Sequence, residues 1–407
     1  MINLEQIYRA ERGRVLASLI RLLGSFELAD EALADAFLAA AQWPRDGLPA
    51  NPRTWLISAG RFKAIDRLRK SGRFKTIAPE LRRQIESEDT MPAERQDIED
   101  DTLRLIFTCC HPALSADAQV ALTLREVCGL TTEEIAAAYL ARPAALAQRI
   151  VRAKARIREA HLPYEVPAAA DWPERLDTVL HTIYLIFNEG YSASRGDALI
   201  RHELCAEAVR LARLLAALQP SADTDGLLAL MLLHQSRAAA RVGEDGAIIL
   251  LEQQDRSRWN AALIEEGTAL AERAFVNPPV GSYTIQAMIA ATHAAARTAG
   301  DTDWAQIVAL YDLLLRAEPT PIVALNRAVA IAMRDGPAAG LALIEPLAAD
   351  ALAAYRFAHA ARADLLRRLG RRAEAKTAYR DALKFTEQDA ERRFIEGRIE
   401  ELGDPSP

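Results

Sequence analysis

The sequence predicts an all-α protein. Alanine, leucine and arginine dominate the 407 residues, whereas the 19 glycines and 19 prolines are clustered. Apolar residues recur at three- and four-residue intervals, as at Leu16, Leu19, Ile20 and Leu23, and this spacing favours amphipathic helices over strands. A chain of this length is expected to form two or three compact units.

Composition and charge exclude several classes of protein. A hydrophobic share of 50% and a charged share of 26% fit a soluble globular protein. The net charge of -6 argues against a surface that coats nucleic acid throughout, so any nucleic-acid site must be local. The N-terminus lacks the pattern of a signal peptide, and the uncharged stretch 274–296 is broken by prolines and polar residues. A cytoplasmic protein with no membrane partner is therefore expected.

The pattern along the chain predicts four parts. Residues 1–75 and 102–161 have helical periodicity, and residues 76–101 separate them with a run of acids that indicates a flexible, solvated linker. After a proline-containing connection at 162–173, residues 174–402 are again helical. In this extension Gly336 and Gly370 lie 34 residues apart, each between two apolar helices, which is typical of tetratricopeptide repeats. The repeat pattern is clear over 300–400 and weak over 174–299.

The segment around Pro143 predicts a helix-turn-helix. Thr131 or Thr132 can cap a first helix, and Pro143 ends that helix and opens the next. The second helix is basic, with one face formed by Arg149, Arg152 and Arg156. Its neighbours Ile150, Ala153 and Ile157 are expected to face inward. A basic second helix is typical of DNA recognition, and the alternative is an ordinary solvated face.

A second basic helix is predicted between Arg61 and Lys75, with Asp66 as its single acid. Trp55 precedes it and Phe62 lies within it. Cations neutralise phosphates while rings stack on unpaired bases, so this mixture suits melting DNA. The alternative is a solvated helix face with Trp55 in the core.

Patterns of catalysis or metal binding are weak in this chain. Cys109, Cys110 and His111, with Cys128, resemble a metal site, but adjacent cysteines diverge by about 100° on a helix and structural zinc sites favour wider gaps. Buried packing is therefore favoured over a redox or metal role. No nucleophile elbow, phosphate loop or dinucleotide motif is present. The sequence predicts no catalytic residue, no metal and no cofactor, and hence no enzyme.

Residues 188–192, Asn-Glu-Gly-Tyr-Ser, follow an apolar helix expected at 179–187. Two interpretations stay open for this polar segment. Gly190 can end the helix as an ordinary C-cap, or the segment can shape a surface for a ligand or a partner.

Several of these segments resemble a known family. Residues 51–70, with Trp55-Leu56 and Ile65-Asp66-Arg67-Leu68-Arg69, resemble region two of extracytoplasmic-function sigma factors. Residues 28–38 are similar to the helix with which these factors grip the polymerase clamp, and 118–159 resemble region four, which binds the −35 element and the polymerase flap. Residues 184–194 and 254–259 resemble signatures of the subgroup with a tetratricopeptide-like extension. Ala34, Ala147 and Gln148 depart from common family residues, which puts the promoter sequence in doubt.

The resemblance implies a sigma factor that binds core RNA polymerase through its clamp and flap and directs promoter recognition, −10 melting and initiation. The residues implied for the clamp are Asp30, Glu31, Asp35 and Phe37. Those implied near the −10 element are Trp55, Arg61, Lys63, Asp66, Arg67 and Arg69. Those implied at or beside the −35 element are Ala145, Gln148, Arg149, Arg152 and Lys154. The acidic linker would follow the RNA-exit path. Because the extension is fused to a chain without a membrane segment, we expect it to regulate the factor through a regulatory protein or a ligand, or else to be needed for productive polymerase binding.

Two other functions compete with this one. The first is a polymerase-independent repressor that uses only the helix-turn-helix. The second is a helical-repeat scaffold whose N-terminal domains are degenerate.

Overall fold

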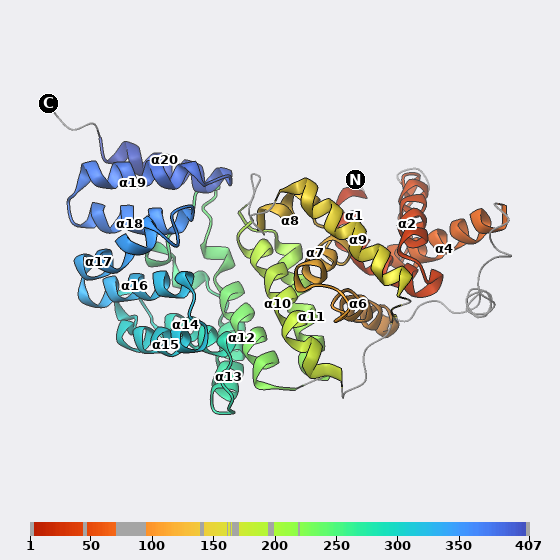
Figure 1. Cartoon of the computed structure of the whole chain (residues 1–407), viewed down its shortest axis with the longest axis horizontal. Coiled ribbons are helices and arrows are strands. Elements are labelled where there is room, and N and C mark those ends of the chain that lie inside the picture. The colour runs from red at the N-terminus through yellow and green to blue at the C-terminus, as the bar shows by residue number, and fades with distance from the viewer. Residues whose placement is uncertain are drawn as a thin grey trace. The chain divides into compact units, whose positions relative to one another are not determined.

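A computed structural model of the chain describes residues 4–43, 47–70, 95–138, 142–160, 162, 164, 171–193, 199–218 and 220–403. Within these ranges every regular element is helical, apart from one isolated bridge between Val242 and Ile248 (Figure 1). The predicted all-α fold is therefore confirmed. The chain divides into two compact units, residues 1–186 and 187–407.

Unit 1 begins with α1 (Leu4–Leu23), α2 (Phe26–Ala40) and α4 (Pro52–Lys70), which pack on one another. Ser25 starts α2, because its Oγ accepts a hydrogen bond from the Leu28 amide at 3.3 Å. At Gly60 of α4 a Cβ would lie 2.9 Å from the carbonyl oxygen of Ala32 on α2. Glycine at this position lets α4, the first basic helix, approach α2 closely.

Helix α6 (Arg95–Cys109) packs on α1 and begins inside the linker that the sequence predicts at 76–101. Its Asp101 is fully buried and pairs with Arg21 at 2.7 Å, although it belongs to the acidic run. The predicted linker thus extends too far at its C-terminal end, because Asp101, its last acidic residue, is buried in the core of unit 1 and does not face solvent. The rest of the predicted linker, at 76–94, lies outside the described residues.

The helix-turn-helix is formed by α8 (Thr132–Ala138) and α9 (Pro143–Glu159), with α7 (Ala116–Glu126) packed against both. Pro143 is the first residue of α9, as its sequence position predicts. The inward-facing side chains are also those predicted, since Ile150, Ala153 and Ile157 are buried. The opposite face of α9 is thereby left for its cations.

Helix α10 (Trp172–Tyr191) crosses the boundary between the units. Unit 2 continues with α11 (His202–Leu218) and α12 (Ala222–Ser236), the short turns η3 (Ala238–Ala240), η4 (Leu251–Gln253) and η5 (Arg256–Arg258), and then α13 (Ala261–Phe275) and α14 (Ser282–Ala295). Helix α12 packs on α11, α13 and α14 and lies at the centre of this half, with most of its residues buried.

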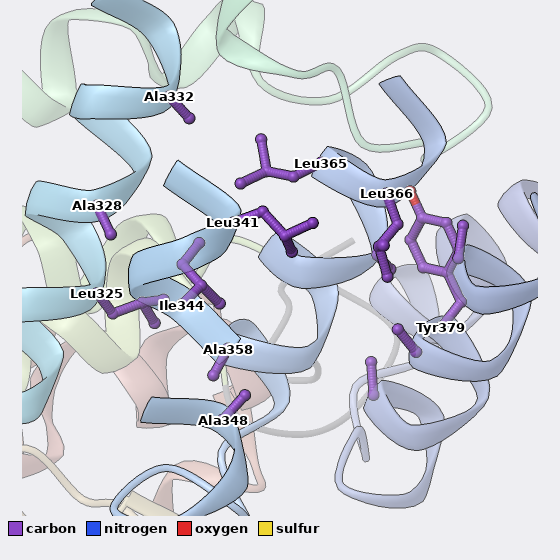
Figure 2. Close-up of a cluster of buried hydrophobic side chains, with 14 of the residues drawn as sticks. Leu325, Ala328, Ala332, Leu341, Ile344, Ala348, Ala358, Leu365, Leu366 and Tyr379 are labelled. Atoms are coloured by element: carbon purple, nitrogen blue, oxygen red, sulfur yellow. The ribbon is translucent and has the colours of Figure 1, made fainter. Parts of the chain in front are cut away.

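The remaining helices pack each on the next: η6 (Ala299–Asp301) leads to α15 (Trp304–Ala317), α16 (Pro321–Asp335), α17 (Pro337–Ala349), α18 (Arg356–Arg368), α19 (Arg372–Lys384) and α20 (Asp389–Glu401). Gly336 and Gly370 connect successive helices with φ of 101° and 75°, values that favour glycine. Between these helices leucine, alanine and Tyr379 side chains form a shared core (Figure 2). This stack matches the predicted tetratricopeptide-like pattern. No helix in the described ranges is both long and apolar enough to cross a membrane.

Candidate nucleic-acid and polymerase interfaces

The basic face of α4 offers one aromatic ring to solvent. Phe62 is 70% exposed and lies beside the exposed Lys63, whereas Leu68 and Ala64 on the other side of the helix are buried. A large exposed ring among cations can stack on an unpaired base. The sequence set for the −10 element omits Phe62, although its position between Arg61 and Lys63 was a usable signal.

Trp55 occupies a different environment from Phe62. Its ring makes an edge contact with Trp43 at 5.1 Å between centroids, and Trp43 is buried. Trp55 itself is half-buried. Much of this ring therefore supports the start of α4, which is close to the core alternative considered from sequence.

Arg67 joins two predicted sites. Its guanidinium donates to Glu31 and to Asp35, each at 2.5 Å, so a residue expected near the −10 element pairs with residues expected at the polymerase clamp. The hydrogen bond to Glu31 is the main cause of a raised pKa at Arg67. Because the side chains of Arg67 and Glu31 are about half exposed (48% and 55%), solvent weakens their pair and it can be exchanged for other partners. Asp66 is engaged by Lys70 at 2.8 Å.

The clamp-facing role expected of Phe37 does not fit its position. Phe37 is 8% exposed and packs edge-on against Tyr8, with 4.7 Å between ring centroids. The next residue, Leu38, is 71% exposed. A step of about 100° along a helix separates the two side chains. Helix α2 thus presents Leu38, rather than Phe37, beside its exposed carboxylates.

The start of α9 presents the side chains expected at the −35 element. Ala145, Gln148 and Arg152 are exposed, and Arg149 pairs with Asp117 at 3.3 Å. A cavity of about 370 Å³ adjoins this face and is lined by Ala113, Leu114, Ser115, Ala118, Arg149, Arg152, Ala153 and Arg156. Three guanidinium groups around one cavity form an environment suited to a phosphate oxyanion.

Lys154 differs from its neighbours on α9. Only 19% of its side chain is exposed, and its Nζ lies 2.9 Å from both Asp30 on α2 and Glu126 on α7. Burial opposes its charge, but the two carboxylates outweigh burial and raise the pKa of Lys154. In this packing the ammonium group is held between protein carboxylates and is not presented on the exposed face of α9.

Further contacts join α7 and α9 to α1 and α2 of the same unit. Arg158 pairs with Glu27 of α2 at 3.0 Å, and Arg12 of α1 donates to the Arg125 carbonyl at 3.2 Å. A Cβ on Gly13 would lie 1.8 Å from the carbonyl oxygen of Val127, so α1 touches the end of α7 directly. Both candidate DNA-binding helices therefore belong to one packed unit.

The adjacent cysteines lie in the core of unit 1. Cys109 and Cys110 are buried, and burial raises the pKa of Cys110 to about 11 and that of Cys109 well above its usual value. Such thiols are poor nucleophiles and poor ligands at neutral pH. No group of three or more His, Cys, Asp or Glu in the described part of the chain is arranged to hold a metal. The packing interpretation accounts for both residues.

The polar segment at 188–192 is not a simple helix end. Helix α10 continues to Tyr191, and a Cβ on Gly190 would lie 2.7 Å from the Cys205 amide nitrogen on α11. Gly190 therefore permits a close helix contact and is not a C-cap. Glu189 is buried and pairs with Arg201 at 3.8 Å. The ring of Tyr191 faces the arginines that follow α12.

Comparison with known proteins identifies three segments. Residues 7–74 match sigma-70 region 2, residues 104–157 match sigma-70 region 4, and residues 175–275 match a family of unknown function. The chain is 44% identical over 397 residues to an uncharacterized protein of Rhizobium meliloti (strain 1021), which covers 96% of this chain and 94% of that protein. No solved structure matches the chain.

Proposed function

Because the chain belongs to the sigma-70 family of the extracytoplasmic-function type, with a C-terminal domain of unknown function, we propose that it binds core RNA polymerase and directs it to promoters. One observation carries the proposal. A single unit contains two basic helices, one with an exposed aromatic ring and one beside an arginine-lined cavity, each within a matching sigma region. The protein acts by binding and not by covalent chemistry.

At the −10 element, α4 captures unpaired bases. Phe62 stacks on a base while Lys63 and Arg69, both exposed, neutralise the flanking phosphates. Trp55, Arg61 and Asp66 position the start and the middle of this surface. Stacking on a ring contributes about 1–3 kcal/mol per base, which supports melting because the duplex offers no such contact.

At the polymerase clamp, α2 presents acids around an apolar centre. Asp30, Glu31 and Asp35 surround the exposed Leu38 within two turns of the helix. Interfaces of this kind have an apolar centre and a polar rim. Leu38 takes the apolar role for which the family resemblance suggested Phe37.

At the −35 element, the first turns of α9 enter the major groove. Ala145 and Gln148 reach base edges, as the N-terminal residues of recognition helices do. Arg149 and Arg152 bind phosphates, and their shared cavity receives one phosphate group. Lys154 joins them only after it leaves Asp30 and Glu126.

Simultaneous binding to both elements requires the unit to open. Base pairs stack at about 3.4 Å each, so the −10 and −35 elements lie tens of ångströms apart. Asp30 and Lys154 are in contact here and cannot remain so on a promoter. Polymerase that binds the acids of α2 would compete for Asp30 and so favour this opening.

Run-off transcription with purified core polymerase tests the proposal on the full chain. A promoter-dependent transcript is expected, and Gln148→Ala with Arg149→Gln should reduce it on linear duplex templates. A polymerase-independent repressor would instead bind duplex DNA tightly by itself and yield no transcript. A scaffold would give neither activity. The absence of a transcript across a library of promoters from the source genome would reject the sigma-factor function.

A further inference from the structure

Unit 2 contains an arginine cluster, formed by Arg237, Arg241 and Arg256, beside the polar end of α10. The Arg241 guanidinium carbon lies 3.6 Å from the centroid of the Tyr191 ring, and its Nη1 donates to the Tyr191 carbonyl. The Arg237 guanidinium carbon lies 5.7 Å from the same ring, and its Nη2 is 3.1 Å from Nδ1 of His234. Two cations thus share one aromatic side chain.

Arg256 brings the segment 254–259 to the same region. Its guanidinium carbon lies 4.7 Å from the Trp259 ring centroid. Its Nη1 donates at 2.6 Å to the carbonyl oxygens of His293 and Ala296, at the end of α14. Arg237 and Arg256 are close enough for their charges to disfavour each other, because Arg237 contributes to the lowered pKa of Arg256.

The carboxylates around the arginine cluster are engaged with other groups. Glu189 pairs with Arg201 at 3.8 Å, Glu391 pairs with Arg356 at 2.8 Å, and Asp301 accepts from the Thr298 hydroxyl at 2.8 Å. Among the residues that the structure describes, no carboxylate lies within ion-pair distance of Arg237, Arg241 or Arg256. Asp301 and Glu391 act on Arg256 and Arg241 only at longer range, so the positive charge of the cluster is partly but not fully compensated by the described residues.

The neighbouring titratable groups respond to this charge. Burial is the main cause of the lowered pKa of His234 and of Arg241, and the charge of Arg237 lowers both further. His293 is affected in the same way and its pKa falls to about 4. The Tyr191 hydroxyl is buried and has no hydrogen-bond partner among the described residues. Buried polar and charged groups without partners are costly, which favours a ligand that supplies an acceptor.

We propose that the arginine cluster binds an oxyanion group, a carboxylate or a phosphate, of a small acidic ligand. The guanidinium fork matches the paired oxygens of such groups. Tyr191, His234 and Arg237 are all partly exposed, so the group can reach the cluster from solvent at this edge. The matched family has no assigned function over 175–275, and this site would give that part of the chain a ligand.

A purely structural role explains only part of the cluster. Arg241 and Arg256 donate to carbonyls near the ends of α10 and α14, where cations stabilise helices. Arg237 donates to no such carbonyl, and the contacts of its side chain are with His234 and the Tyr191 ring. Substitution of Arg237 therefore separates the two roles. A structural role predicts that the substitution lowers stability, whereas a binding role predicts unchanged stability and a lost response to the ligand.

Thermal unfolding of the full chain tests the site, with sodium phosphate, sodium succinate and sodium chloride compared at equal ionic strength. Ligand binding should raise the Tm of unit 2 by roughly 2–4 °C with phosphate, succinate or both, relative to chloride. The effective salt identifies the preferred oxyanion. Arg237→Gln should abolish the rise, yet in chloride its Tm should be no lower than that of the wild type, because it removes a repelled charge.

Arg380→Gln is the matched control, since Arg380 is an exposed arginine of α19 on the same unit. The Arg380→Gln variant should show the same increase in Tm with phosphate or succinate as the wild type. If Arg237→Gln does not fold, Arg237→Lys retains the charge without the fork and should at least halve the rise. The proposal is overturned if neither salt raises the wild-type Tm above its value in chloride. An equal rise in wild type and the Arg237 variant would overturn it as well.

Discussion

At the scale of single residues, Phe62 is an exposed aromatic side chain on a basic helix, and the proposed function gives its ring a stacking role. Removal of its ring should cost the stacking energy of about 1–3 kcal/mol, which corresponds to a fall of roughly 5- to 150-fold in open-complex formation. Phe62→Ala should leave the Tm unchanged, because the ring is 70% exposed. Permanganate reactivity of −10 thymines measures the melting of the promoter DNA. Val276→Ala, at an exposed position of unit 2, should have no effect, and normal opening by Phe62→Ala would contradict the stacking role.

Substitutions of Phe37 and Leu38 should have different effects, the first on the stability of unit 1 and the second on polymerase binding. Phe37→Ala removes a buried ring and should lower the stability of unit 1 by about 3–5 kcal/mol. Leu38→Ala should leave stability unchanged and weaken core polymerase binding about tenfold, as expected for the apolar centre of an interface. Denaturant unfolding and a fluorescence binding assay give the two readings. If Leu38→Ala leaves polymerase affinity unchanged, Leu38 is not part of the surface that binds the clamp.

His293 should make unit 2 sensitive to acid. Burial and the nearby Arg237 and Arg256 lower its pKa from 6.5 to about 4, so the unfolded chain binds the proton more readily than the folded chain between these values. Stability therefore falls as pH drops through this range, by about 3 kcal/mol in total for a shift of this size. His293→Gln should reduce that decline in denaturant unfolding between pH 7 and pH 4, and His234, whose pKa is also lowered by burial, should account for part of what remains. If the dependence of the unfolding free energy on pH is the same in the variant and the wild type, His293 is not buried in its neutral form.

Residue-level predictions from sequence succeeded where they depended on near neighbours. The inward face of α9, with Ile150 and Ala153, follows from helical spacing alone. The partners of Arg67 and Lys154 could not be predicted in this way. Asp30 is 124 positions from Lys154, and only the packing of α2 against α9 brings them together. The family register identifies α2 but not which of the adjacent side chains of Phe37 and Leu38 faces solvent.

At the scale of elements, Gly13 tests the contact between α1 and α7. Gly13→Ala should leave α1 intact, because alanine favours helix over glycine by about 1 kcal/mol. The added Cβ would meet the Val127 carbonyl oxygen at 1.8 Å, however, so the end of α7 must move away. Cys128 follows Val127 and is only partly exposed, so its reaction with a thiol reagent should accelerate several-fold.

Gly397→Ala provides the control for Gly13→Ala. A Cβ at this position of α20 would meet no atom within 4 Å, so this substitution should not change the Cys128 labelling rate. Equal rates in the two variants would mean that α1 and α7 separate readily without any added strain. Acceleration confined to Gly13→Ala would show that the added Cβ displaces the end of α7 from α1.

At the scale of the whole molecule, the division into units was the part least accessible to sequence. Prolines at 162–173 indicate a connection before the extension, and the sequence therefore predicts that the extension covers 174–402. The structure instead gives the first part of α10 to unit 1, where Thr182 Oγ1 lies 3.8 Å from Cys110 Sγ and Arg175 donates to the Phe107 carbonyl at 3.3 Å. Periodicity identifies an amphipathic helix, but it does not identify which core its apolar face joins.

This division changes how a truncated chain should be interpreted. A chain that ends at residue 164 loses the contacts of Arg175 and Thr182 and should uncover Cys110, which is buried in the full chain. Its unit 1 should unfold at a lower temperature and its Cys110 should react with thiol reagents, whereas a chain that ends at residue 193 should retain both properties. Calorimetry and mass spectrometry of labelled protein measure the difference.

If both chains unfold alike, α10 contributes nothing to unit 1, and any change in transcription on truncation can be assigned to lost regulation by the extension. If only the shorter chain is destabilised, lost transcription reports a damaged sigma unit instead.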